Sequence, residues 1–116
     1  MCHCDDCQRR TGSVFSIAAF FPREAVTVQG GSKTFTRASL SGSAIDFHFC
    51  PDCGSTVWWE PARMPHLVGI GVGAFADAAF PAPEQSVWTR DKHRWLTLPD
   101  HMVCYDVMRP APPPAS

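Results

Sequence analysis

Residues 2–7 of the chain read CHCDDC, and residues 50–54 read CPDCG. The first stretch places three thiols close together, and the second is a C-x-x-C turn followed by a glycine. Gly54 suits the left-handed backbone that such a turn requires, and amides of the turn can face the sulfur atoms. Zinc in proteins takes about four such ligands in a tetrahedron. The two stretches together therefore predict a metal site, on which the interpretation of the fold depends.

The size and charge of the chain narrow its functional class. It has 116 residues, with 10 Lys and Arg against 11 Asp and Glu, so we expect one soluble domain. No basic patch is present, and binding of nucleic acid through its phosphates is not expected. The longest strongly apolar run, residues 17–21, is too short to cross a bilayer, and the first residues lack the apolar region of a secretory signal. We therefore expect a cytoplasmic protein without a membrane partner, whose thiols stay reduced.

Short apolar segments between turn residues predict a mainly β domain over residues 1–108. The apolar run 16–21 predicts a buried strand that ends at Pro22. Residues 25–29 and 34–37 flank two glycines and predict a hairpin. The other expected strands are 44–49, which alternates apolar and polar residues, then 56–60, 66–72 and a short one at 87–88.

The two ends of the chain differ from this β pattern. Residues 5–10 predict a single helical turn directly after the first cysteines. Residues 109–116, RPAPPPAS, contain four prolines in five residues and predict a disordered or extended tail.

The thiols allow two ligand sets. If Cys4 and Cys7 share a zinc ion with Cys50 and Cys53, the site is closed and structural. If Cys2, Cys4 and Cys7 share the ion, one position stays open for a substrate thiol or a carbonyl oxygen. Spacing favours the closed set, which leaves Cys2 unused. Iron in a small electron carrier is the alternative to zinc, because tetrahedral sulfur suits both ions.

The residues around these thiols resemble a known family. C-H-C-x-x-C-Q-R-x-T-G-S at residues 2–13, a hydrophobic strand, and F-C-P-x-C-G-S-x-x-W-W at residues 49–59 are similar to the glutathione-dependent formaldehyde-activating enzyme family, which includes centromere protein V. The stretches 72–75 and 87–99 resemble its C-terminal half, so the resemblance covers residues 2–105. It implies a zinc-containing β-tent fold.

The resemblance also implies roles for the cysteines. Cys2, Cys4 and Cys7 match the thiols that hold the catalytic zinc, and Cys50 and Cys53 match thiols of a structural zinc, giving one or two Zn²⁺ per chain. Glutathione is the implied co-substrate, and formaldehyde is converted to S-hydroxymethylglutathione in a reaction classed as that of a carbon–sulfur lyase. The main hypothesis is thus an enzyme acting on a small-molecule thiol and an aldehyde. The alternative is a non-catalytic zinc-binding structural or interaction module.

Four other residues are candidates for substrate binding. Arg9 and Arg10 can pair with carboxylates of a glutathione-like thiol, or they form a solvated basic pair beside the acidic residues 5–6. Gln8 is a candidate pocket donor or a cap of a short turn. Trp59 lines the pocket or packs in the core, and Trp58 points to the opposite face of the strand.

The chain departs from the family pattern in one respect. The family's structural zinc takes two further thiols from an upstream C-x-C-G pair, whereas residue 1 here stands directly before Cys2. We therefore expect a member shortened at the N-terminus or a misplaced start. Cys50 and Cys53 would then borrow Cys4 and Cys7, lose metal, pair with a second chain, or oxidise to a disulfide. An edge exposed by a missing strand would also favour a homodimer.

Overall fold

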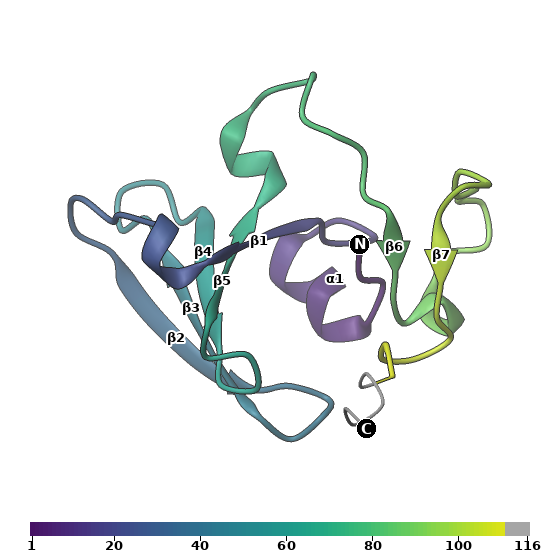
Figure 1. Cartoon of the computed structure of the whole chain (residues 1–116), viewed down its shortest axis with the longest axis horizontal. Helices are drawn as coiled ribbons and strands as arrows, with labels where there is room; N and C mark the ends of the chain where they lie inside the picture. Colours follow the sequence, from purple (N-terminus) through teal and green to yellow (C-terminus); the bar gives the residue numbers. More distant parts are fainter. Residues whose placement is uncertain (111–116) are drawn as a thin grey trace, which may run out of the picture. The chain divides into compact units, whose positions relative to one another are not determined.

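The computed structural model describes residues 1–110, and these residues form two compact units (Figure 1). One unit is Ala18–Phe80. The other combines Met1–Ile17 with the chain from Pro81 onward. The mainly β prediction is confirmed, because the Ala18–Phe80 unit is built on a five-stranded antiparallel sheet and the described residues contain one α-helix, of seven residues.

The Ala18–Phe80 unit is a five-stranded antiparallel sheet with the strand order β1-β5-β4-β3-β2 (Figure 1). Its strands are β1 (Ala18–Pro22), β2 (Lys33–Ala38), β3 (Ala44–Phe49), β4 (Thr56–Pro61) and β5 (Leu67–Gly71). Two 3₁₀ turns accompany them, η1 (Arg23–Ala25) and η2 (Val72–Phe75). The expected strands at 44–49, 56–60 and 66–72 are confirmed to within two residues at each end.

One row of residues crosses the whole sheet on a single face. The register places Phe20 opposite Gly69, Gly69 opposite Trp59, Trp59 opposite Phe47, and Phe47 opposite Phe35. The two central rings are buried, with Trp59 6% and Phe47 5% exposed, and their centroids lie 5.7 Å apart. Phe20 and Phe35 stand on the edge strands and are 45% and 60% exposed.

Gly69 makes this packing sterically possible. A Cβ atom built on Gly69 would overlap Nε1 of the Trp59 indole and lie 2.8 Å from Cε2. The indole therefore lies directly over the backbone of β5, in space that any other residue would fill. A glycine in the middle of a strand often marks such a close approach.

Two details of the predicted strands are wrong. The run 16–21 was expected to be buried, but β1 is an edge strand, and Phe20 and Pro22 are exposed. Pro22 fits this position, because an edge strand can lack a backbone donor. Residues 25–29 do not pair with β2. Residue 25 ends η1 and residues 26–29 are irregular chain. β2 instead forms its hairpin with β3 through residues 39–43, and the six paired residues satisfy one edge of the β2 backbone.

The opposite face of the sheet carries a polar network that the sequence did not reveal. His48 Nε2 lies 2.7 Å from Glu60 Oε1, and its Nδ1 lies 3.1 Å from Thr34 Oγ1. Arg23 donates to the other Glu60 oxygen at 2.5 Å. The imidazole also stacks on Trp58 with centroids 3.7 Å apart. Four segments of the unit are thereby joined by side chains as well as by the backbone.

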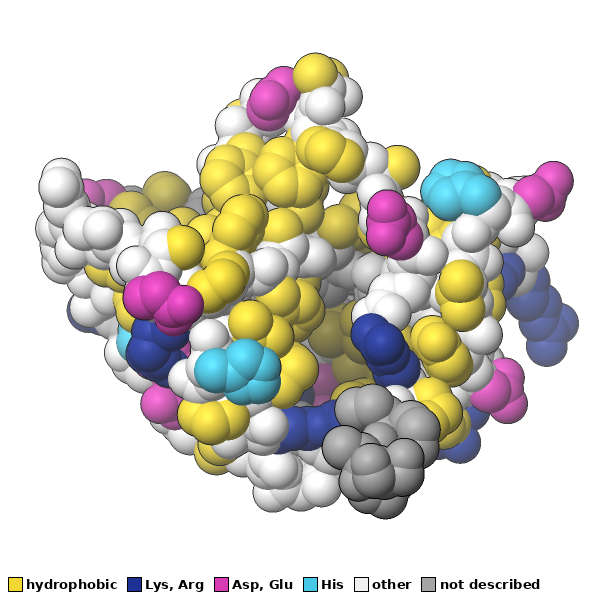
Figure 2. Space-filling view, in the orientation of Figure 1, with side chains coloured by type: hydrophobic (Ala, Val, Ile, Leu, Met, Phe, Trp, Pro, Cys, Tyr) yellow, Lys and Arg dark blue, Asp and Glu magenta, His cyan; other side chains and the backbone are white. Residues whose placement is uncertain are grey.

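Beyond β5, the chain forms η2 and a loop that ends the unit. Phe75 stacks on Phe80 with ring centroids 5.0 Å apart. Figure 2 shows hydrophobic side chains gathered over this segment, at the top of the view. Ala76 ends η2 with φ 48°, in the left-handed region.

The second unit contains the helix α1 (Asp5–Thr11), the strands β6 (Gln85–Ser86) and β7 (Val103–Cys104), and the 3₁₀ turn η3 (Thr89–Asp91). β6 and β7 pair in parallel as a two-stranded sheet. The expected helical turn at 5–10 is confirmed, and β6 ends one residue before the expected strand at 87–88. Among the described helices, none has the length and apolar character needed to span a membrane.

The domain boundaries stay predictions. Two compact units can belong to one folding domain, so the division does not test a single domain over 1–108. In the expected tail, residues 109–110 are irregular and 111–116 lie outside the described residues.

We predict that Gly69→Ala destabilises the protein by about 1–3 kcal/mol, because the new methyl group must displace the Trp59 indole or the β5 backbone. Urea unfolding measures the difference. Gly31→Ala is the matched control, since its Cβ meets nothing within 4 Å and its backbone is not left-handed. It should change the free energy of unfolding by less than roughly 0.5 kcal/mol. Equal stabilities for the two variants would contradict the packing argument.

The Glu60 network predicts that the free energy of unfolding depends on pH. Burial alone raises the pKa of Glu60, but hydrogen bonds from Arg23 and His48 and their charges lower it overall. A carboxyl with a lowered folded-state pKa contributes stability above its unfolded pKa of about 4.3 and loses it as the pH falls through the folded value.

The wild-type protein should therefore have a larger free energy of unfolding than the Glu60→Gln variant at neutral pH. This difference, called the gap below, should shrink as the solution is acidified. Unfolding titrations at a series of pH values measure this gap. Glu24→Gln, which removes an exposed carboxyl in η1, is the control and should show little gap at any pH. A Glu60 gap that is independent of pH would refute the prediction.

Candidate metal centre

Helix α1 places the last two cysteines of CHCDDC. Cys4 is its N-cap, and the Cys4 sulfur accepts a hydrogen bond from the backbone N–H of Cys7 at 3.3 Å. A negative sulfur is favoured at this end by the helix dipole. The helix ends at Gly12, which adopts φ 66° and donates its N–H to the Gln8 carbonyl at 2.9 Å. A short helix with defined ends thus fixes both thiols.

Cys2 is fixed by backbone pairing. Its N–H donates to the Ser16 carbonyl at 2.8 Å, and the Ser16 N–H donates back to the Cys2 carbonyl at 2.9 Å. The next residue, His3, donates its N–H to the Val87 carbonyl at 3.2 Å. The first residues of this unit therefore lie between segments that precede and follow the sheet in sequence.

These elements bring the three predicted ligands together. The sulfur atoms of Cys2, Cys4 and Cys7 all lie within 4.8 Å of one another. Cys4 is buried, and the other two are half-buried. This is the one group of three or more such side chains that could hold a metal among residues 1–110.

The crowded thiols resist ionisation. Hydrogen bonds with Cys4 and Cys7, together with burial, strongly raise the pKa of Cys2. The Cys2 hydrogen bond lowers the pKa of Cys7, but the bond with Cys4 and burial outweigh it, so that this pKa is also raised. Arg10 acts in the opposite direction on Cys7. A cation among the sulfurs would remove the repulsion between thiolates.

The donor set fits zinc. Tetrahedral zinc with Zn–S distances of about 2.3 Å needs sulfur atoms about 3.8 Å apart, so thiols within 4.8 Å require only small movements. Thiolates are among the ligands that zinc prefers. The residues could therefore hold the ion that the sequence predicts.

His3 is not a member of the sulfur group. Its Nε2 lies 2.7 Å from the Ser86 hydroxyl, and both side chains are fully buried. Burial lowers the pKa of His3, as do the positive charges of the N-terminus and Lys92, and the neutral form of the ring is thereby favoured. Ser86 thus orients the residue that separates two of the predicted ligands.

Gln8 connects the helix to the chain after β6. Its amide nitrogen donates to the carbonyl oxygens of His3 at 2.8 Å and Asp91 at 3.3 Å. Its Oε1 lies 2.9 Å from His93 Nε2 and can only accept, so the proton is on that imidazole nitrogen. Gln8 therefore positions the segment around the cysteines.

The predicted basic pair divides into two roles. Arg9 is exposed and lies 4.0 Å from Asp6, which matches the solvated alternative. Arg10 is half-buried and donates to the Ser16 hydroxyl at 2.6 Å. Trp59 lies in the core of the sheet unit, as its packing alternative expected. That Gln8, Arg9, Arg10 or Trp59 binds substrate stays a prediction.

The second cysteine motif forms the expected turn, in the sheet unit. Gly54 has φ 76° and donates to the Cys50 carbonyl at 2.7 Å, while the Cys50 N–H donates to the Ser55 carbonyl at 2.9 Å. The Cys53 thiol lies 3.3 Å from the Ser55 hydroxyl, and hydrogen bonds that Ser55 can donate to the thiolate lower the pKa of Cys53. Metal binding by Cys50 and Cys53, with or without Cys4 and Cys7, stays a prediction.

Comparison with known proteins decides the family. The family model of the glutathione-dependent formaldehyde-activating enzyme matches residues 1–91. The chain belongs to this family. Its membership supports a glutathione-dependent formaldehyde-activating or related function. A search of curated proteins found no match.

The match to the formaldehyde-activating family includes both cysteine motifs and the four predicted binding residues. The relation to centromere protein V, the shortened start, the cytoplasmic location and the homodimer stay predictions. His93 lies beyond the matched range, and sequence reasoning assigned it no role. Ser86 also escaped notice, because a lone serine or histidine distant in sequence from the cysteines carries no spacing signal.

We predict that Gln8→Met, which keeps the side-chain length but removes the amide, destabilises the protein by about 1–3 kcal/mol through the loss of three hydrogen bonds. It should also shift the His93 ring resonances in NMR spectra. Thermal unfolding and ¹H–¹⁵N correlation spectra of the imidazoles measure these effects. Arg9→Met is the control, because its ion pair is exposed and should contribute less than about 1 kcal/mol. Unchanged His93 resonances in Gln8→Met would contradict this assignment.

Proposed function

We propose that the chain is a zinc-dependent carbon–sulfur lyase-type enzyme that acts on glutathione, or a similar thiol, and a small aldehyde. The observation that carries the proposal is the group of three sulfur atoms within 4.8 Å, in a chain of the formaldehyde-activating family. Three protein ligands leave one of the four positions of a tetrahedral ion for another molecule. Catalytic zinc sites in proteins have this ligand count, whereas structural ones have four.

The reaction joins the sulfur of the thiol to the carbonyl carbon of the aldehyde. The new C–S bond uses the sulfur electron pair, the C=O π bond opens, and the thiol proton ends on the former carbonyl oxygen. Bound zinc supplies Lewis-acid chemistry that lowers the pKa of a coordinated thiol, since the thiolate is the nucleophile. Cys2, Cys4 and Cys7 hold the ion in this proposal.

Other residues serve binding and positioning. Arg9 is exposed, and its guanidinium matches the geometry of a carboxylate, of which glutathione has two. Arg10, fixed by Ser16, places a positive charge near Cys7, where the charge favours thiolates. Gln8 holds the helix against the chain around Asp91 and His93.

The second candidate function is a structural zinc module. The observation that favours it is that Cys4 is buried and is also the N-cap of α1. A metal ion bound to Cys4 would therefore stabilise the start of the helix, which is a structural role. In this alternative, chelation unfolds the domain outright. In the enzyme proposal, chelation removes activity while the sheet signal in circular dichroism persists.

We predict that zinc-edge X-ray absorption of the purified full chain gives three sulfurs and one oxygen or nitrogen in the first shell. Exchange NMR should show that the zinc-loaded protein accelerates formation and breakdown of the thiol–aldehyde adduct. Cys2→Ser should lower both zinc content and this acceleration, whereas Cys104→Ser, which alters an exposed cysteine outside the group, should leave both unchanged. Four sulfurs and no acceleration would reject the enzyme in favour of the structural module.

A further inference from the structure

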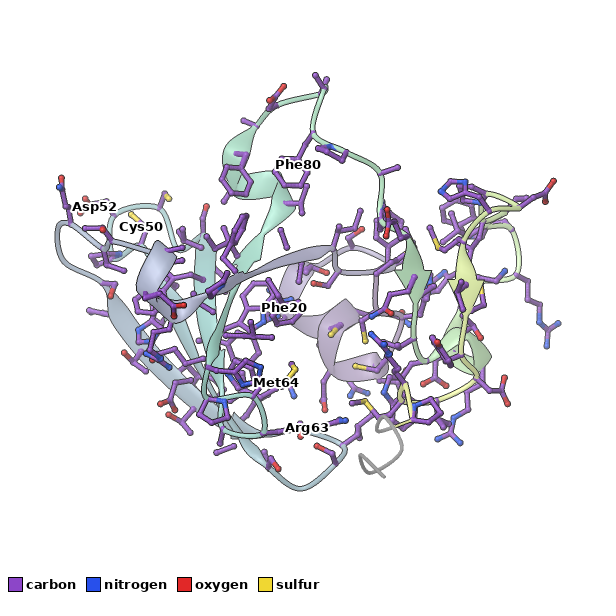
Figure 3. All side chains as sticks on the ribbon, in the orientation of Figure 1. Phe20, Cys50, Asp52, Arg63, Met64 and Phe80 are labelled. Carbon is purple, nitrogen blue, oxygen red and sulfur yellow. The ribbon has the colours of Figure 1, made fainter. Side chains whose placement is uncertain are left out.

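β2 is an edge strand whose outer side is open. The sheet order places it at one border of the sheet, and β1, which carries the labelled Phe20, at the other (Figure 3). Within residues 1–110, the backbone of β2 pairs with no strand other than β3. Five of its six residues are exposed. A further strand can therefore add at this border.

The hydrogen-bond pattern fixes which backbone groups of β2 point outward. The Ser39 N–H donates to the Ser43 carbonyl at 2.8 Å, at the closed end of the β2–β3 hairpin. Along an antiparallel ladder, residues that bond to the neighbouring strand alternate with residues whose N–H and C=O groups face the other way. The outward groups therefore belong to every second residue, which are Thr34, Thr36 and Ala38.

β2 lacks most of the features that close an edge strand to pairing. The other edge strand, β1, includes Pro22, which has no backbone donor. β2 contains no proline, and its register with β3 runs over six residues without a bulge. Phe35 in its middle is 60% exposed. What remains is charge, because Lys33 and Arg37 flank Phe35 on the same face of the strand.

These charges distinguish between the registers in which two β2 strands can pair. If a two-fold axis passed through Phe35, Lys33 of one copy would oppose Arg37 of the other, and like charges directly opposite are destabilising. If the axis passes through Thr36, this residue opposes itself, and Phe35 opposes Arg37 of the second copy. A guanidinium is attracted to an aromatic ring beside it. The second register thus replaces a repulsion by an attraction.

The same register satisfies the outward backbone groups. Thr34 opposes Ala38, and Thr36 opposes itself, so that all three outward residues lie in hydrogen-bonded pairs. With the other axis, Ala38 would oppose residue 32, which precedes the strand. The Ala38 carbonyl already accepts from the Arg37 side chain at 3.3 Å, but a carbonyl oxygen has a second lone pair. Charge and backbone pairing therefore select one register.

We propose that the protein forms a two-fold symmetric homodimer in which the β2 strands of two copies pair antiparallel, with Thr36 on the axis. The two five-stranded sheets then become one continuous sheet. Strands of six residues are short compared with the interfaces of permanent dimers, so we expect a reversible association. The interface is separate from the three-thiol group and does not depend on the proposed reaction.

The test uses the reduced full chain, labelled with ¹⁵N, at a series of concentrations. Sedimentation equilibrium should show a monomer in equilibrium with a dimer. Hydrogen exchange at the amides of Thr34, Thr36 and Ala38 should slow as the concentration rises, because these N–H groups gain a partner only in the dimer. The Phe35 amide faces β3 in both states and is the internal control, whose exchange should change least.

Two variants that add the same charge to the same face test the register. Thr36→Lys places two lysines directly opposite each other and should raise the dimer dissociation constant at least about tenfold. In Thr34→Lys the new side chain opposes Ala38, so the constant should change less than about threefold. The variants are matched, since each loses one side-chain hydrogen bond, that of Thr36 with Asp46 or that of Thr34 with His48.

Several results would overturn the proposal. Sedimentation as a monomer at every concentration would show that no dimer forms, and slow exchange of the three outward amides in that monomer would show that another segment covers the edge. A dimer in which these amides exchange as fast as in the monomer would place the interface elsewhere. Equal dissociation constants for Thr36→Lys and Thr34→Lys would reject the register with Thr36 on the axis. The exchange measurement needs no variant, so it decides even if a variant fails to fold.

Discussion

The crowding of three thiols at the start of α1 is the constraint on which the smaller unit depends. This unit has a two-stranded sheet and a short helix, so it buries few large apolar side chains against one another. Its residues are ordered instead by hydrogen bonds that converge on CHCDDC, from Ser16, Val87 and Ser86. A cation bound to the sulfurs would add the attraction that a hydrophobic core supplies elsewhere.

The sheet unit is stabilised by a different kind of contact. Its strands are joined by the row of aromatic rings centred on Trp59 and, on the other face, by the polar network of His48 and Glu60. The sheet unit is thus stabilised by packed side chains, whereas the unit with the three thiols is stabilised mainly by hydrogen bonds around them.

The parts of the fold that follow local rules could be predicted from the sequence. The alternation of apolar and polar residues in 44–49 predicted β3. The glycine after C-P-D-C predicted the turn at Gly54. The spacing of Cys2, Cys4 and Cys7 is local and marked a thiol cluster, but spacing alone favoured a ligand set without Cys2. The three-thiol set was implied by the resemblance to the family. Burial of residues 16–21 was predicted wrongly, since an apolar run is the same at an edge as in the centre of a sheet, and only the strand order separates them. Ser86 and His93 could not be found, because their roles come from contacts over 83 and 85 residues of sequence.

Those long separations have a consequence for biosynthesis. The ribosome produces the three clustered cysteines first, then the whole of Ala18–Phe80, and only afterwards Ser86, Val87 and His93. During that interval the sheet can fold, but the segment CHCDDC has none of its later hydrogen-bond partners. During synthesis the three thiols therefore lack these hydrogen-bonded neighbours and are accessible to oxidants and to metal ions. A metal ion bound as proposed by these three thiols would meet their complete set of hydrogen-bonded neighbours only after His93 has been synthesised.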